Sequence, residues 1–369
     1  MKTVCLENDC VGCKACVDVC PKNAIAVIDS LISYNALIDE SLCVKCDMCH
    51  QICQNNNAIT LLDSKVWKQG WADDNIRKRS SSGGIASAII SAFIKNGGVV
   101  CSCIFKDGKF GFAFSETEED SSKFRGSKYV KSDPEGIYKQ IKKKLVSGIK
   151  VLFLGLPCQV AAVKLYIGDK YAEELYTVDL ICHGTPSPQI LEKFLNVYGR
   201  SLKNIEDISF RSKTAFRVHV DYDSLVPLGV QDTYTFAFLT SLDYTENCYR
   251  CRYAQSKRIA DITLGDSWGS DLPIEERRKG VSLILCQTEK GKELLASSGV
   301  KMENVNQEKA IENNHQLQHP SVCPVKRDKF FKLLSMGHSF NKAVALCYPK
   351  AYYKQKLKAI LIRLRLFKV

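Results

Sequence analysis

The chain has 369 residues, of which 45% are hydrophobic and 25% charged, enough to bury a sizeable core in two or three domains. No stretch approaches 18 uninterrupted apolar residues, so no spanning helix is expected, and 18 cysteines without an apolar signal segment predict a reducing, cytoplasmic location. The net charge of +12 could suggest nucleic acid, but no zinc finger or aromatic RNA-binding signature accompanies it, so nucleic-acid binding is not expected.

Eight cysteines near the N-terminus form one motif written twice. The two copies are Cys10, Cys13, Cys16 and Cys20, followed by Pro21, and then Cys43, Cys46, Cys49 and Cys53. Each copy has the spacing C-x2-C-x2-C-x3-C, which gives three thiolates to one 4Fe-4S cluster and the fourth to another. The repeat predicts a two-cluster ferredoxin domain over residues 1–65 and a role in electron transfer.

Crossed ligation is the pairing that this spacing predicts. It assigns Cys10, Cys13, Cys16 and Cys53 to one cluster, and Cys20, Cys43, Cys46 and Cys49 to the other. Zinc and disulfides are the alternatives, but zinc tetrads have longer gaps and a disulfide framework requires an exported chain. Gln54 stands where proline would normally follow the last cysteine, which we interpret as a local difference in the loop.

Residues 66–79 are polar and charged and are predicted to be a linker. Beyond them, apolar runs bounded by turn residues predict strands at 98–105, 151–154, 176–182, 261–264 and 281–286. Helices are expected at 85–95, 135–147, 159–166 and 190–198. This alternation predicts a mixed α/β domain with a largely parallel sheet after the α+β ferredoxin-like domain, in two parts that cover residues 80–165 and 166–335.

Two cysteines, Cys158 and Cys182, follow buried strands of this predicted domain. Because ligands collect at the carboxyl ends of strands in open α/β sheets, neighbouring strands would bring these thiols together. Cys248 and Cys251 add a two-cysteine spacing typical of metal sites, which completes four ligands. Isolated cysteines are also common as small buried hydrophobes. Core packing is the expectation for the other cysteines in apolar surroundings, Cys101, Cys103, Cys286 and Cys347.

A serine-glycine loop, Ser81, Ser82, Gly83 and Gly84, follows three basic residues and runs into the helix predicted at 85–95. Small residues and a helix N-terminus favour the binding of a phosphate, so the loop predicts an anion cradle for a nucleotide. A capped surface helix would look similar. Lys128 lies in a second basic, hydroxyl-bearing patch at 127–129, which by itself is typical of a solvated turn.

Six short motifs occur in one order and together carry a resemblance to a known family. They are SSGG at 81–84, SKYV at 127–130, LGLPCQV at 154–160, DLICHG at 179–184, CYRC at 248–251 and DITLGDSWG at 261–269. This series resembles the coenzyme F-420 hydrogenase/dehydrogenase beta-subunit family over roughly residues 70 to 335, here preceded by the ferredoxin domain.

The resemblance implies FAD as the central cofactor and a third 4Fe-4S cluster held by Cys158, Cys182, Cys248 and Cys251. Ser81 to Gly84 and Lys128 would then contact the flavin nucleotide. The resemblance is a weak argument for the use of coenzyme F-420 itself, because related members act on other substrates. The ferredoxin-first arrangement also resembles bacterial proteins encoded among polysaccharide-synthesis functions.

The expected function is that of an iron-sulfur flavoprotein oxidoreductase, in which FAD exchanges two electrons and the clusters relay them singly. A non-catalytic electron-transfer subunit for a partner enzyme and a redox sensor are the alternatives. The redox partner would be a ferredoxin or a larger oxidoreductase. His183 could donate a proton near the flavin or merely support its neighbours, and Asp266 could bind a ribityl hydroxyl or cap a turn.

Residues 336–369 are predicted to form a basic amphipathic tail. Residues 320–369 carry twelve Lys or Arg and a single acid, Asp328. On a helix, one face would hold Tyr353, Leu357, Ile360, Leu361 and Leu364. Such a helix could lie in the interface of the inner membrane face, or pack on the protein's own core or on a partner.

Overall fold

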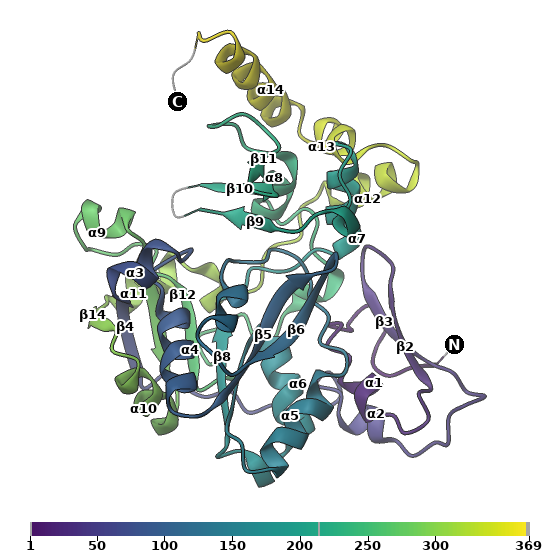
Figure 1. Ribbon diagram of the computed structural model, residues 1–369. Helices are drawn as coiled ribbons and strands as arrows, with labels where there is room; N and C mark the ends of the chain where they lie inside the picture. Colours follow the sequence, from purple (N-terminus) through teal and green to yellow (C-terminus); the bar gives the residue numbers. More distant parts are fainter. Residues whose placement is uncertain (1, 213–214, 367–369) are drawn as a thin grey trace.

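The computed structural model describes residues 2–212 and 215–366. Its N-terminal segment is a small body beside the main sheet (Figure 1), with an antiparallel sheet in the order β1-β3-β2. Short helices carry the cysteine motifs, and apolar side chains such as Val4 and Ile25 pack with the cysteines in one core. The elements of this segment are β1 (Lys2–Thr3), α1 (Ala15–Val19), β2 (Ile25–Asp29), β3 (Tyr34–Ile38) and α2 (Met48–Gln51).

An eight-stranded sheet forms the centre of the molecule, in the order β14-β4-β13-β12-β8-β7-β5-β6. Only the four central strands, β12, β8, β7 and β5, are parallel, and antiparallel strands extend both edges. The mixed α/β fold is confirmed, although the sheet is less parallel than expected. Its strands are β4 (Val66–Trp71), β5 (Val99–Lys106), β6 (Lys109–Ser115), β7 (Val151–Gly155), β8 (Leu175–Leu180), β12 (Ile262–Asp266), β13 (Ser282–Cys286) and β14 (Lys301–Asn304).

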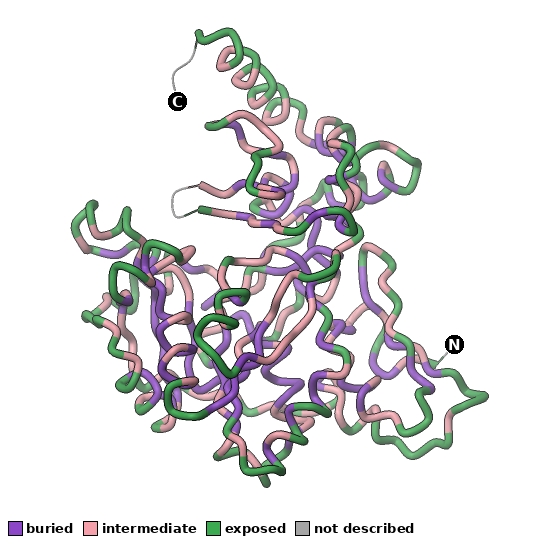
Figure 2. The backbone as a smooth tube through the Cα atoms, in the orientation of Figure 1, coloured by how far each residue is buried: buried purple, intermediate pink, exposed green. Residues whose placement is uncertain are grey.

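Helices cover both faces of this sheet. Side chains alternate between faces along a strand, and in β7 Val151 and Phe153 pack in one core with α5 and α6, whereas Leu152 packs in another with α4 and α10. The strands between these layers are largely buried (Figure 2). The covering helices are α4 (Ile85–Lys95), α5 (Ile137–Val146), α6 (Pro157–Ile167) and α10 (Glu289–Ser297).

A third body lies beyond one end of the large sheet (Figure 1) and has its own core around Phe194, Tyr234 and Phe340. It consists of an antiparallel sheet, β9 (Ile208–Arg211), β10 (Phe216–Val220) and β11 (Asp223–Ser224), with helices α7 (Pro188–Asn196), α8 (Thr233–Leu239), α12 (Arg327–Ser335) and α13 (Phe340–Cys347). The remaining helices are α3 (Asp74–Lys78), α9 (Ile274–Arg278), α11 (Gln307–Glu312) and α14 (Pro349–Arg363).

The segment expected as a linker, 66–79, forms β4 and α3 instead. Its polar residues have partners that are distant in sequence: Lys68 Nζ donates to Asn304 Oδ1 at 2.6 Å, and Gln69 Nε2 donates to Asn304 O at 3.0 Å. The sequence of this strand resembles a linker because its polar side chains hydrogen bond to residues more than 200 positions away, whereas Val66 and Trp67 pack against apolar cores. The boundary expected at 165/166 falls inside α6.

The C-terminal tail begins later than expected, because α13 packs in the core through Phe340, Ala343 and Val344. Only α14 projects from the molecule (Figure 1), and it has no buried residue. The helix is not packed into the core, although Gln355 Oε1 accepts from Gln231 N at 3.2 Å. Its apolar and polar side chains are not segregated to opposite faces, so the expectation of an amphipathic helix is not met. Among the described residues, no helix combines the length and the apolar composition needed to cross a membrane.

Candidate functional site

The eight motif cysteines line two separate cavities of about 20 Å³ each, grouped as crossed ligation requires. We call the cavity lined by Cys10, Cys13, Cys16 and Cys53 the first site, and the cavity lined by Cys20, Cys43, Cys46 and Cys49 the second site. Backbone N–H groups donate to ligand sulfurs at each, from Gly12 to Cys10 Sγ at 3.4 Å and from Lys45 to Cys43 Sγ at 3.4 Å. Hydrogen bonds to the sulfurs of an iron-sulfur cluster change its reduction potential.

The two sites differ in exposure. At the first site Cys10 and Cys16 are buried, whereas at the second site Cys46 is exposed. The large side chains around the second site, Leu42, Val44 and Met48, are exposed as well. The second site therefore lies at the surface of the molecule and the first lies inside it.

Cys5 is a fifth thiol of the first site, and the sequence reasoning missed it. It lines the same cavity and hydrogen bonds with Cys10 and Cys53, and its sulfur accepts from Asn55 Nδ2 at 3.6 Å. The hydrogen bond with Cys10, followed by burial, raises the pKa of Cys5 to about 11. Its position just before the first motif was the only available signal, since it has no counterpart in the repeat.

Four further cysteines come together at the end of the large sheet, as the sequence predicts. Cys158, Cys182, Cys248 and Cys251 line one cavity of about 260 Å³, which we call the third site. Cys158 lies in the first turn of α6 just after β7, and Cys182 follows the adjacent parallel strand β8. Burial and the neighbouring thiols Cys248 and Cys251 raise the pKa of Cys182 to about 12.

No group of three or more His, Cys, Asp or Glu side chains within residues 2–212 and 215–366 is arranged to hold a metal ion. The assignment of the third site to a cluster therefore rests on the shared cavity and on the electrostatic coupling of the four thiols. Four soft thiol donors around one cavity fit the ligand set of a 4Fe-4S cluster.

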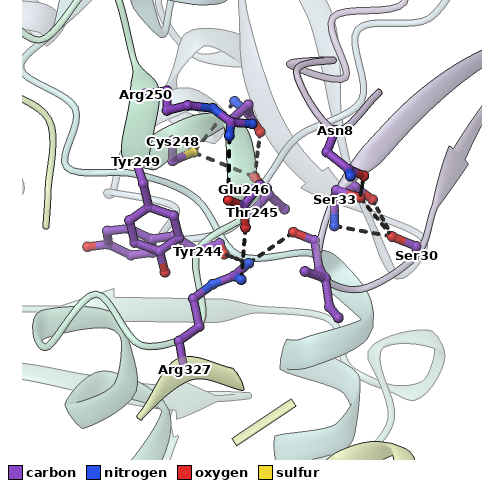
Figure 3. Close-up of polar contacts among 12 residues, drawn as sticks. Asn8, Ser30, Ser33, Tyr244, Thr245, Glu246, Cys248, Tyr249, Arg250 and Arg327 are labelled. Carbon is purple, nitrogen blue, oxygen red and sulfur yellow. Dashed lines mark hydrogen bonds and ion pairs between the residues drawn. The ribbon is translucent and has the colours of Figure 1, made fainter. Parts of the chain in front are cut away.

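A buried arginine fastens the turn that carries Cys248 (Figure 3). Arg327 Nη1 pairs with Glu246 at 2.9 Å, and Nη2 donates to Tyr244 O at 3.0 Å and to Ile32 O at 3.2 Å. Since Ile32 lies in the loop between β2 and β3, this one guanidinium ties the third-site turn to the ferredoxin segment.

The serine-glycine loop meets the second basic patch, because Ser127 N donates to Ser81 Oγ at 3.4 Å. Part of this loop already packs against the large sheet. Gly83 N donates to Ser282 Oγ at 3.1 Å, and a Cβ at Gly83 would lie 2.4 Å from Gly70 O. Gly83 is thus required by packing on the sheet. Ser81 and the first-turn amides of α4 remain as donors that fit a phosphate.

The ammonium of Lys128 is not free to bind a ligand, because it already has hydrogen-bond partners within the protein. Its ammonium donates to the carbonyls of Phe124, Arg125 and Gly126 at 3.1, 2.9 and 3.2 Å, and burial lowers its pKa. A direct contact with a flavin phosphate would require it to leave these partners. Neither Lys128 nor the serine-glycine loop lines the third-site cavity.

His183 does line the third-site cavity, next to Cys182. Burial and the nearby His315 lower the pKa of His183 to about 4, so its imidazole is neutral at pH 7. Its Nδ1 lies 2.6 Å from the side-chain amide of Gln316, which also lies 2.6 Å from Nε2 of His315. Asp266 is paired with Arg211 Nη1 at 2.6 Å.

The remaining cysteines lie largely where expected. Cys101, Cys286 and Cys347 are buried in apolar cores, and Cys103 is half-buried against one. Cys323, which the sequence reasoning did not consider, is exposed.

A dicluster segment joined to an α/β body with a third cysteine tetrad is an arrangement typical of iron-sulfur electron-transfer proteins. Residues 9–57 match the family described as 4Fe-4S dicluster domain. Residues 68–135 and 148–312 match the N-terminal and C-terminal parts of the coenzyme F420 hydrogenase/dehydrogenase beta subunit. The chain belongs to this beta-subunit family, which gives it a redox function.

One solved structure similar to this chain is described as the F420-reducing [NiFe] hydrogenase complex from Methanosarcina barkeri. The similarity has 21% identity and a TM-score of 0.46, and covers 71% of this chain and 93% of the other. A likeness at this level carries no argument about function. The comparison with curated proteins gave no match.

Proposed function

We propose that this chain is an iron-sulfur flavoprotein oxidoreductase with three 4Fe-4S clusters and FAD. The observation that carries the proposal is the third site, where four cysteines from three separate segments surround one cavity. The ferredoxin segment lies against this cavity, because Leu6, Asp9, Val11 and Asn55 also line it. Three thiol sites in one chain provide the ligands for a relay between the surface and the α/β body.

FAD, when bound, would supply the conversion between two-electron exchange with a substrate and one-electron exchange with the clusters. Ser81 and the first-turn amides of α4 are the residues that would hold its phosphates. At the third site, His183 lines the cavity next to Cys182 and is the candidate proton donor near the flavin. We place the protein in the cytoplasm on its cysteine content.

Anaerobically purified protein is expected to contain about 12 iron atoms per chain, four for each tetrad, together with extractable FAD. Cys158→Ser combined with Cys248→Ser should reduce the iron content to about eight atoms, because it removes half of the third-site ligands. Iron analysis and a flavin extraction measure both quantities. Cys323→Ser is the matched control, since this exposed cysteine lies outside all three sites.

An iron content near eight in the unmodified chain, unchanged in the double variant, would contradict the third cluster. Full iron without flavin would instead support a second function, a non-catalytic electron-transfer subunit for a partner oxidoreductase. The exposed second site, with Cys46 at the surface, favours that alternative. Reduction of the flavin by reduced coenzyme F420 would extend the family's named coenzyme to this chain.

The helix α14 is proposed to contact an anionic membrane surface. Its apolar side chains are largely exposed, with 60% of Tyr353, 58% of Leu357, 46% of Ile360 and 62% of Leu364 accessible, and it contains no acidic residue. An exposed basic helix with apolar residues can bury the latter in a lipid interface while its cations attract anionic headgroups. The redox partner would then act at the inner membrane face.

The full chain is expected to float with anionic liposomes, and high salt should weaken this binding because it screens the attraction. Leu357→Glu combined with Ile360→Glu should abolish flotation while all three cysteine sites stay intact. Glu275→Gln, a charge change of similar exposure on α9, is the control. Equal and negligible flotation of all chains would rule out the membrane and leave a protein partner for α14.

A further inference from the structure

Gln54 lies at the contact between the first site and the third site. It follows Cys53 directly and is 1% exposed. Its side-chain Nε2 donates to Cys158 O at 2.7 Å, and its Oε1 accepts from the Tyr253 hydroxyl at 2.6 Å. Its backbone carbonyl accepts from Arg252 Nη1 at 2.8 Å. Both polar atoms of its side chain are therefore bonded to the third-site loops.

Each of these partners belongs to a segment that carries a third-site thiol. Cys158 is itself one of the four cysteines, and Arg252 and Tyr253 directly follow Cys251. On the other side, Gln54 directly follows Cys53 and lines the first-site cavity together with Cys13. A single buried amide thus contacts residues of both sites.

Other contacts hold the first-site segment against α5. The Tyr138 hydroxyl donates to Cys13 O at 2.7 Å, and the carboxylate of Asp18 accepts from Gly136 N at 2.7 Å and Tyr138 N at 3.2 Å. The second site has no such link, since every residue that lines its cavity lies between Cys20 and Cys49. The first site is therefore the one that is linked to the third.

We propose that Gln54 is a positioning residue that couples the first site to the third, so that electrons can pass between the clusters that these two sites would hold. In each such step one electron would leave one of the two bound clusters, which is oxidised, and enter the other, which is reduced. No bond is made and no proton moves. Proline, which normally follows the last cysteine of the motif, has no side-chain amide and cannot make these contacts. This inference rests on the proposed three-cluster function.

The test compares the full anaerobic chain with Gln54→Leu, which has a similar volume but no amide. A photochemical one-electron reductant supplies electrons, and freeze-quenched electron paramagnetic resonance follows reduction of each cluster with time. We expect Gln54→Leu to keep about 12 iron atoms. Reduction of the third cluster should be slower than in the unmodified chain, because the side-chain hydrogen bonds that fix the third-site loops against Gln54 are lost. Gln51→Leu, at the exposed last residue of α2, should match the unmodified chain.

Tyr253→Phe removes only the hydroxyl that donates to Gln54, and should slow the transfer less than Gln54→Leu does. If Gln54→Leu loses iron, Tyr253→Phe still tests the role of Gln54 in electron transfer. Unchanged transfer in both variants, with about 12 iron atoms present, would overturn the role of Gln54 and leave the proposed function standing. An iron content near eight in the unmodified chain would overturn the proposed function itself, and this inference with it.

Discussion

Arg258→Leu is expected to destabilise the protein by about 3–5 kcal/mol, because it leaves a buried carboxylate without its counter-charge. Arg258 is 2% exposed, and its Nη2 pairs with Asp179, which is fully buried, at 3.2 Å. The same guanidinium donates from Nη1 to Tyr253 O at 2.7 Å and from Nη2 to Leu180 O at 3.1 Å. It therefore supports the segments before Cys182 and after Cys251.

Urea denaturation under anaerobic conditions measures this loss, and iron analysis should show that the third site is lost first. Asp179→Asn added to Arg258→Leu should restore part of the stability, since it removes the uncompensated charge. Arg278→Leu, at an exposed arginine of α9, should change stability little. An unfolding midpoint of Arg258→Leu equal to that of Arg278→Leu would contradict the prediction.

Asp243 is expected to make stability fall as the pH rises between about 4 and 8. Burial raises the pKa of Asp243 to about 8, although Arg327 acts in the opposite direction. Neither carboxylate oxygen has a hydrogen-bond partner among the described residues, and Tyr234 and Tyr244 face it. In this window the folded chain keeps a proton that the unfolded chain has lost, so the free energy of unfolding decreases with pH.

Asp243→Asn should remove this contribution, because asparagine resembles the protonated acid and does not titrate. The slope removed is at most about 1.4 kcal/mol per pH unit, so the difference from the unmodified chain grows to about 5 kcal/mol near pH 8. Denaturation of both chains at pH 5 and pH 8 measures it. Asp223→Asn, at an exposed acid of β11, is the control. Parallel pH profiles for Asp243→Asn and the unmodified chain would show that Asp243 is ionised when buried.

The cysteine repeat and the central elements were accessible from the sequence because they depend on local spacing. The helix predicted at 85–95 matches α4, and the strands predicted after residue 98 match the central sheet within a few residues. Strand endings also predicted correctly that Cys158 and Cys182 meet, since β7 and β8 are parallel neighbours. These features follow from apolar periodicity and from the geometry of parallel sheets.

The tertiary structure alone decided the features that depend on pairings between distant residues. β4 is a strand because β13 and β14 flank it, not because its residues are apolar. Gln54, which in the sequence is only a departure from proline, spans two candidate sites. A buried polar side chain is defined by its hydrogen-bond partners, and here those partners lie more than 100 residues away, where no local pattern can indicate them.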